Sequence, residues 1–293
     1  MARIAIIGGG SMGEALLAGL LRAGRQVKDL VVAEKNPERV KFLAEKHSVL
    51  VTSVVEATDN ATYVILAVKP ADVEHVIDDI AAAAANAETD TAEQVFVTVA
   101  AGVTTAYYES KLPAGAPVVR AMPNAPVVVG GGVTALAPGR FATAEHLKEV
   151  SALFDSVGGV LTVPEPQLDA VTAVSGSGPA YFFLMVEALV DAGVAAGLSR
   201  SVATDLVVQT MAGSAAMLLE RLDEAQPAGD VAGLSPAAGF DTTAAQLRAT
   251  VTSPAGTTAA GLRELERGGL RSAVANAVDA AKTRSEQLGI TSG

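Results

Sequence analysis

Residues 2–13 read ARIAIIGGGSMG, and this stretch decides how the first half of the chain folds. The apolar run Ile4 to Ile7 predicts a buried strand, and the glycines after it fit the pattern G-x-G-x-x-G between a strand and a helix. In that context the first glycine permits a tight turn, the second lets the backbone approach a pyrophosphate, and the third allows close helix–strand packing. The residues expected to bind a dinucleotide at the helix N-terminus are Gly8, Gly10, Ser11, Met12 and Gly13.

The same pattern extends outward from this turn. Over the first hundred residues short β-branched runs alternate with helical patterns, which predicts a parallel sheet covered by helices on both faces. Further strand-like runs continue as far as residue 163. Helical patterns dominate after residue 163, with one loop-rich interruption at 225–241. We therefore expect an α/β, Rossmann-like dinucleotide-binding domain over residues 1–163 and an all-α domain over residues 164–293. The expected strands are 2–7, 29–33, 50–52, 63–68, 94–99, 118–121, 132–137 and 160–163; the expected helices are 12–23, 37–46, 73–85, 166–174, 179–198, 201–221, 242–251, 257–267 and 270–288.

Composition excludes several classes of partner and site. The net charge is −11, and no block of Lys and Arg offers the footprint that nucleic acid requires. The absence of cysteine rules out disulfides and thiolate metal sites and fits a reducing compartment. The three histidines, His47, His75 and His146, are scattered among charged residues, so we expect them to be solvated and expect no metal site. The first strand begins at once, without a signal peptide, and we expect a cytoplasmic protein.

The helix expected at 179–198 is apolar almost all round, as is its successor. Glu187 and Asp191 argue against a membrane span, because each would be costly inside a bilayer. A small helical domain has little room to bury two such helices in its own centre. We therefore expect a second copy of the chain to cover them, in a homodimer or a larger homo-oligomer.

Two further features concern the cofactor. Glu34 follows the second expected strand, where an acid would bind the ribose hydroxyls of NAD. Lys35, Asn36 and Arg39 follow at once and could hold a 2′-phosphate, so the preference between NADH and NADPH stays open and we expect both to be accepted. The run Ala67-Val68-Lys69-Pro70 closes the fourth strand on the ligand side of the sheet, where Lys69 is equally compatible with a solvated loop.

Two loops of small residues precede expected helices in the second domain. They are Ser175-Gly176-Ser177-Gly178-Pro179 and Thr252-Ser253-Pro254-Ala255-Gly256-Thr257-Thr258. Each combines hydroxyls with unpaired amides at a helix N-terminus, which is a natural carboxylate site, although either alone could be a simple helix cap. Two such loops behind a dinucleotide fold favour a small anionic substrate.

With the run Arg120-Ala121-Met122-Pro123-Asn124-Ala125-Pro126, these motifs resemble the pyrroline-5-carboxylate reductase family over nearly the whole chain. The resemblance implies an all-helical C-terminal dimerisation domain and the NAD(P)H-dependent reduction of 1-pyrroline-5-carboxylate to L-proline, the last step of proline biosynthesis. Two positions depart from the family pattern. Ala255 stands where Gly is usual, and a Gly there would suit a positive φ; Ala125 stands where Thr is usual.

The resemblance also implies roles for individual residues. Thr258 would hydrogen-bond the substrate's ring nitrogen and is the expected catalytic residue. The expected substrate-binding residues are Glu165, Ser175, Gly176, Ser177, Gly178, Ser253, Gly256, Thr257 and Thr258. Ala67, Val68, Lys69, Pro70 and Asn124 would lie along the ribose–nicotinamide side of the cofactor, while Glu34 and Lys35 would bind its adenosine end.

Two other functions use parts of the same pattern. A β-hydroxyacid or 6-phosphogluconate-type dehydrogenase shares the domain plan, but such enzymes usually place a catalytic lysine in the helical domain. Here no lysine lies between Lys148 and Lys282, which weakens that alternative. A regulatory module that senses nucleotides without turnover explains the glycine turn but gives the two loops no role.

Overall fold

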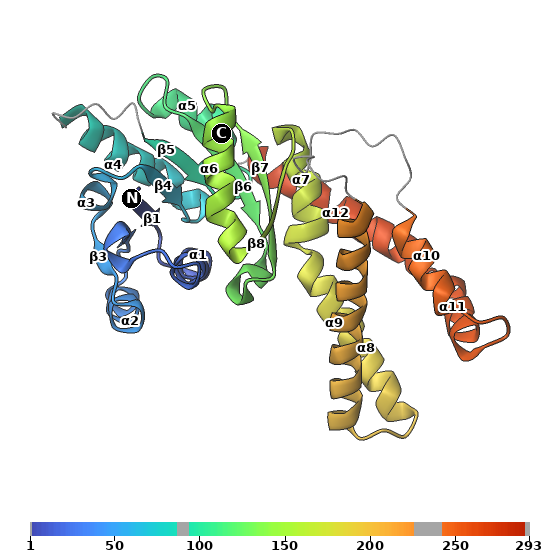
Figure 1. Ribbon diagram of the computed structural model, residues 1–293. Coiled ribbons are helices and arrows are strands. Elements are labelled where there is room, and N and C mark those ends of the chain that lie inside the picture. Colours follow the sequence, from blue (N-terminus) through green and yellow to red (C-terminus); the bar gives the residue numbers. More distant parts are fainter. Residues whose placement is uncertain (1, 87–93, 226–241, 291–293) are drawn as a thin grey trace. The chain divides into compact units, whose positions relative to one another are not determined.

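The computed structural model describes residues 2–86, 94–225 and 242–290 of the 293-residue chain (Figure 1). By its internal contacts the chain forms two compact units, residues 1–177 with 281–293, and residues 178–280. The sequence-based division into residues 1–163 and 164–293 stays a prediction. Of the loop-rich segment expected at 225–241, residues 226–241 lie outside the described residues, and Ala225 ends helix α9.

The first unit is built on a sheet whose strand order is β3-β2-β1-β4-β5-β6-β7-β8. Strands β1 to β6 pair in parallel, as the alternation of strands and helices predicts. Their order reverses from one side of β1 to the other, and in open α/β sheets ligands bind beyond the carboxyl ends of strands at such a point. The strands are β1 Ile4–Ile7, β2 Leu30–Ala33, β3 Leu50–Thr52, β4 Tyr63–Leu66, β5 Val95–Thr98, β6 Val118–Pro123, β7 Gly132–Pro138 and β8 Gly158–Thr162.

Beyond the first hundred residues the sheet contains one antiparallel pair. Strand β7 runs antiparallel to β6, and β8 then runs parallel to β7. The reason is the length of the connection, because only residues 124–131 separate β6 from β7. A parallel crossover needs about a dozen residues or more, so this short segment, which forms a 3₁₀ turn over Ala125–Val129, returns the chain in the opposite direction.

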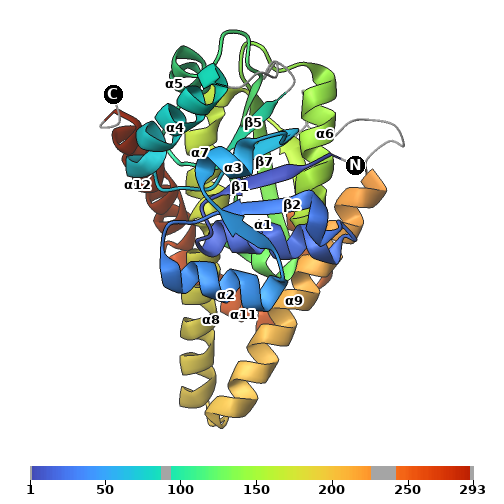
Figure 2. The same ribbon diagram turned by 90° about the vertical axis from the view of Figure 1, so that its left-hand side faces the viewer.

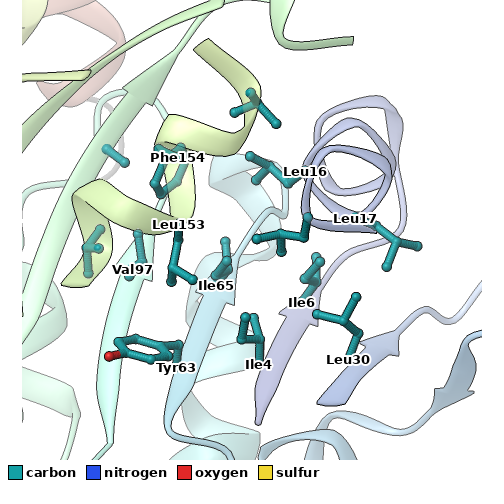
Figure 3. Packing of buried hydrophobic residues seen from close by; sticks show 14 of the residues in the cluster. Ile4, Ile6, Leu16, Leu17, Leu30, Tyr63, Ile65, Val97, Leu153 and Phe154 are labelled. Carbon is teal, nitrogen blue, oxygen red and sulfur yellow. The ribbon is translucent and has the colours of Figure 1, made fainter. Parts of the chain in front are cut away.

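Apolar side chains pack on both faces of this sheet. Alternate residues of a strand point to opposite faces, so Ile4 and Ile6 join one cluster while Ala5 and Ile7 join the other. Figure 3 shows the first cluster, in which Leu16 and Leu17 of α1 pack over the strands. Because every residue of β1 is buried, its carboxyl end forms a rigid base for the glycine turn.

Helices cover both faces (Figure 2). The helices expected next to the strands are present within a residue or two, whereas α3, α5 and α6 were missed by the sequence analysis. The missed α6 carries a capping box in which Thr143 and His146 exchange hydrogen bonds, with His in place of the usual Glu or Gln. The helices are α1 Ser11–Arg22, α2 Pro37–His47, α3 Val54–Thr58, α4 Val73–Asn86, α5 Thr105–Lys111, α6 Ala144–Phe154 and α7 Leu168–Val171.

The end of the last helix, α12 (Leu270–Ile290), belongs to the first unit. Ser285 is buried, and its hydroxyl donates a hydrogen bond of 2.6 Å to Asp169. Near the end of α12, Gly289 lies against Gly102, where a Cβ on Gly102 would come within 3.2 Å of the Gly289 backbone. A side chain at either position would disturb this backbone contact, so the glycine pair fixes where the helix packs.

The second unit is helical. It contains α8 Gly178–Ala195, α9 Arg200–Ala225, α10 Thr243–Thr250, α11 Thr257–Arg267 and the first part of α12. Helices α8 and α9 pack against each other, yet large apolar side chains of α8 remain uncovered: Phe182, Phe183 and Leu184 are 63–67% exposed. By length and composition alone, helices over 165–195 and 200–222 could also span a membrane, a test that apolar helices of soluble proteins pass as well.

Candidate active site

The glycine turn lies between β1 and α1 and has the geometry that its sequence predicts. Gly8 has φ +104°, and a Cβ there would lie 2.6 Å from the carbonyl oxygen of Ala67. A Cβ on Gly13 would collide with the Gly8 carbonyl, so the third glycine allows the close helix–strand packing expected of it. At Gly10, the N-cap of α1, a Cβ would meet nothing within 4 Å. The backbone is therefore open at the position where a pyrophosphate would approach the helix N-terminus.

The run that closes β4 lies directly against this turn. The Ala67 amide donates a hydrogen bond of 2.8 Å to the Ile7 carbonyl, and Val68 contacts the Cβ position of Gly8. Lys69 and Pro70 follow as exposed residues at the start of a 3₁₀ turn. The structure thus brings together two motifs that are more than fifty residues apart in the sequence.

Glu34 lies at the end of β2, beside the same turn. One carboxylate oxygen accepts a hydrogen bond of 2.9 Å from the Gly9 amide, and the other accepts from the amides of Lys35 (2.8 Å) and Asn36 (2.9 Å). The acid is therefore held at the edge where a cofactor ribose would bind, as its spacing from the glycine turn predicts.

Asn124 follows β6 and links two parts of the first unit. Its side-chain oxygen accepts a hydrogen bond of 2.9 Å from the Val133 amide, and its nitrogen lies 3.3 Å from the Ser175 hydroxyl. The 3₁₀ turn that begins after Asn124 packs on α1, where Arg22 lies within hydrogen-bonding distance of the Val128 carbonyl. Asn124 is thus fixed to β7 and to Ser175.

The segment at 175–179 is not the loop that its composition predicts. Residues Thr172–Gly176 form a π-helical stretch, and the Ser177 amide donates to the Thr172 carbonyl at 2.8 Å. The chain is therefore already helical before α8 begins, and the amide of Ser177 is not free for a carboxylate. The small size of Gly176 has another use here, because the Met122 side chain lies 3.0 Å from where its Cβ would be. A role of Ser175, Gly176, Ser177 and Gly178 in substrate binding stays a prediction.

Glu165 has contacts that the sequence did not reveal. Its carboxylate accepts hydrogen bonds from the amide and hydroxyl of Thr105, at 2.8 and 2.7 Å, and lies 3.3 Å from the guanidinium of Arg120. The Arg120 side chain is only 8% exposed, so Glu165 neutralises a buried cation and joins β6 to the start of α5. A charged residue inside the apolar run of β6 was the one available signal that a partner had to exist.

In the second unit, the loop before α11 is a true helix start. Gly256 is the N-cap, its amide donates to the Ser253 carbonyl at 3.0 Å, and no side chain caps the helix. The first-turn amides therefore lack intrahelical acceptors, while Ser253, Thr257 and Thr258 expose their side chains. Ala255 has φ +59°. The position therefore has the positive φ that suits Gly, although the residue here is Ala.

Comparisons with known proteins give matches along nearly the whole chain. A family model described as pyrroline-5-carboxylate reductase dimerisation matches residues 165–288, and one described as NADP oxidoreductase, coenzyme F420-dependent, matches residues 3–102. The pyrroline-5-carboxylate reductase of Mycobacterium tuberculosis is 73% identical, with 99% of this chain and 98% of that protein covered. The corresponding enzyme of Mycobacterium leprae is 70% identical, with 100% and 98% covered.

Solved structures give the same result. The pyrroline-5-carboxylate reductase of Coxiella burnetii is 33% identical, with a TM-score of 0.83 and 98% of each chain covered. The pyrroline carboxylate reductase of Plasmodium falciparum, solved with NADP bound, is 28% identical, with a TM-score of 0.78 and 98% of each chain covered. These relatives match both the Rossmann-like first part and the helical second part, so the chain belongs to the pyrroline-5-carboxylate reductase family, a family of NADP-dependent oxidoreductases.

Proposed function

We propose that this chain reduces 1-pyrroline-5-carboxylate to L-proline with hydride from NADPH or NADH, the last step of proline biosynthesis. The observation that carries the proposal is the loop before α11, with exposed hydroxyls at Ser253, Thr257 and Thr258 and uncapped first-turn amides. Uncapped amides at a helix N-terminus favour a carboxylate, which the substrate possesses.

The residues of the first unit fit a nicotinamide dinucleotide. The open backbone at Gly10 and the first-turn amides of α1 would hold the pyrophosphate, and Glu34 would face the adenine ribose. The run Ala67 to Pro70 and Asn124 would border the nicotinamide side, since Ala67 abuts the glycine turn and Asn124 is fixed by Val133. When bound, the cofactor supplies the hydride, while the protein supplies position and electrostatics.

On the substrate, Ser253, Gly256 and Thr257 would hold the carboxylate while the Thr258 hydroxyl hydrogen-bonds the ring nitrogen. A cyclic imine can arrive protonated as the iminium, so the site needs no strong acid, which fits hydroxyls in place of His or Lys. Holding the imine carbon close to the hydride donor contributes several kcal/mol to the lowering of the barrier, roughly 5 or more. The Glu165 carboxylate is held by Thr105 and Arg120. We propose that it borders the substrate site in this fixed position.

We also propose that the enzyme works in the cytoplasm as a homodimer or as a homo-oligomer built from dimers. The exposed apolar side chains of α8 require a cover, and the matching dimerisation family spans the helices that carry them. A second copy of the chain supplies such a cover without a membrane. We propose no nucleic-acid partner, since the chain is acidic.

One assay separates this function from its rivals. The purified protein is incubated at alkaline pH with NAD⁺ or NADP⁺ and either proline or 6-phosphogluconate, and cofactor reduction is followed by absorbance. Reduction of NAD⁺ or NADP⁺ with proline, but not with 6-phosphogluconate, supports the proposal. Turnover of 6-phosphogluconate would favour a β-hydroxyacid dehydrogenase, and cofactor binding without turnover of either compound would favour a regulatory module.

A further inference from the structure

The basic side chains that follow β2 are all engaged within the protein. Arg39 donates to the Gly9 carbonyl through two nitrogens, at 3.0 and 2.6 Å, and Nη2 also lies 2.7 Å from a Glu14 oxygen. Its guanidinium stacks on Phe42, 4.8 Å from the ring centroid. Lys35 pairs with Asp72 at 3.0 Å, but its side chain is 81% exposed, and such pairs are weak. Arg39 is therefore the firmly held cation of the two.

The backbone groups at this corner are engaged too. Successive amides of a turn form a good anion site, and here the amides of Lys35 and Asn36 already donate to the Glu34 carboxylate. A 2′-phosphate at this corner would therefore meet a carboxylate in place of free amides. Like charges at such short range disfavour the phosphorylated ribose, whereas ribose hydroxyls can donate to the acid.

Glu14 is the charged partner of Arg39 and adds to the hold of the Gly9 carbonyl and Phe42. It lies in the first turn of α1, its side chain is 18% exposed, and it also pairs with Lys46 at 2.8 Å. Burial raises the pKa of this carboxyl, but hydrogen bonds from Lys46, Arg39 and His47 outweigh that effect and lower the pKa to about 2. The carboxylate is thus ionised at physiological pH and keeps the guanidinium against the Gly9 carbonyl.

We propose that Glu14 is a specificity-determining residue for the cofactor: by holding Arg39 against the glycine turn, it withholds the guanidinium from a 2′-phosphate and makes the site prefer NADH to NADPH. The inference rests on the proposed function, because it assumes that the turn binds a nicotinamide dinucleotide. NADPH still binds, in keeping with the NADP dependence of the family, since Lys35 can leave its exposed pair with Asp72 and approach a phosphate.

The test is the ratio of dissociation constants, Kd for NADPH over Kd for NADH, measured by nicotinamide fluorescence without substrate at fixed ionic strength. For the wild-type protein we expect a ratio of about ten or more. Glu14→Gln should lower the ratio by about fivefold, mainly through tighter NADPH binding. Glu45→Gln is the matched control, because it removes the same charge from an exposed pair with Lys41 and should leave the ratio unchanged.

Variants of Arg39 and Glu34 complete the test. Arg39→Gln should weaken both cofactors by similar factors, because in the wild-type protein Arg39 supports the Gly9 carbonyl. Added to Glu14→Gln, it should abolish the gain for NADPH. Glu34→Ser should also shift the ratio toward NADPH, by removing the carboxylate that faces the phosphate. If Glu14→Gln fails to fold, Arg39→Gln alone decides.

Three results would overturn the inference. A wild-type ratio near one would show that there is no preference to explain. A selective loss of NADPH binding in Arg39→Gln would show that Arg39 already reaches the 2′-phosphate. An equal response of Glu14→Gln and Glu45→Gln would reduce the effect to net charge. These results leave the proposed function standing, whereas failure of both cofactors to bind would overturn the proposed function as well.

Discussion

The two units of the molecule differ in how far their apolar residues are buried. In the first unit every residue of β1, β2, β4 and β5 is buried, and helices on both faces of the sheet cover them. In the second unit α8 is apolar along most of its length, yet Phe183 and Leu184 are 65% and 67% exposed. The first unit therefore completes its own core, while the second leaves large apolar side chains exposed, which the proposed second copy would cover. The stability of the first unit is expected to depend on single contacts and that of the second on assembly.

The largest expected effect comes from charging the uncovered helix. Ala188→Glu places a carboxylate on the exposed face of α8, where burial against a partner would leave it without a counter-charge. We expect insoluble protein or an inactive monomer, judged by yield, sedimentation and activity. Ala144→Glu is the control, since it adds the same charge at the exposed first position of α6, where an acid suits the helix N-terminus. Soluble, active oligomers of Ala188→Glu would remove α8 from the interface.

The next effect is on catalysis. Thr258→Val keeps the side chain's shape and removes its hydroxyl, so it should lower both kcat and kcat/KM. A hydrogen bond of about 1–3 kcal/mol implies a fall of roughly ten- to a hundredfold. Thr250→Val is the control, because that hydroxyl donates to the Leu247 carbonyl on α10 and should not affect the kinetics. A lower melting temperature with full kcat/KM would show that Thr258 only stabilises the helix start, and Ser253 would become the candidate.

A contact inside the first unit should matter for stability. Glu165→Gln leaves the buried Arg120 without its counter-charge, which should cost about 3 kcal/mol in the free energy of unfolding. Urea denaturation measures it. Glu74→Gln is the matched control, since its pair with Lys111 is on the surface and should contribute little. Equal stability of the two variants would mean that the Glu165 contacts are not what holds β6 to α5.

The dependence of stability on pH tests the ion pairs of Glu14 in the first unit. The pKa of Glu14 is lowered from 4.5 to about 2 because hydrogen bonds from Lys46, Arg39 and His47 outweigh the effect of burial. A depressed folded-state pKa means that the stabilisation is complete above pH 4.5 and is lost as the pH falls from there toward 2. Glu14→Gln should therefore flatten the fall in stability over that interval, in urea melts at a series of pH values. An identical slope in wild type and variant would contradict this role.

The smallest effect is expected in the loop before α11. Ala255 has φ +59°, which strains a residue with a Cβ, so Ala255→Gly should raise the free energy of unfolding by about 0.5–1 kcal/mol. Thermal melts measure the gain, and Ala259→Gly, in the first turn of α11, is the control that should destabilise. A loss of stability in Ala255→Gly would mean that the positive φ carries no strain.

Much of the first unit could be predicted from the sequence because its strands are continuous β-branched runs. The glycine turn and Glu34 were predictable for another reason, since their positions within one β-α-β unit are set by short spacings. Helices α3 and α5 are too short to stand out from the sequence, and the direction of β7 depends on the length of the connection from β6.

The candidate site was predictable only where a motif is local. The loop before α11 is a helix start, as predicted, whereas Ser175 to Pro179 has the composition of a helix start but follows a π-helical stretch. Glu165 and Arg120 are 45 residues apart, so nothing in the spacing shows that they meet. The hold of Glu14 on Arg39 was hidden for the same reason, because the two residues lie on different helices.

The measurement that tests the account most directly is the native mass of the active wild-type protein. Sedimentation is carried out at assay concentration, with the reduction of pyrroline-5-carboxylate followed in the moving boundary. We predict that all activity travels with a dimer or a larger assembly, because α8 is uncovered in the single chain. A fully active single chain of 29.5 kDa would contradict the claim that a second copy completes the helical unit.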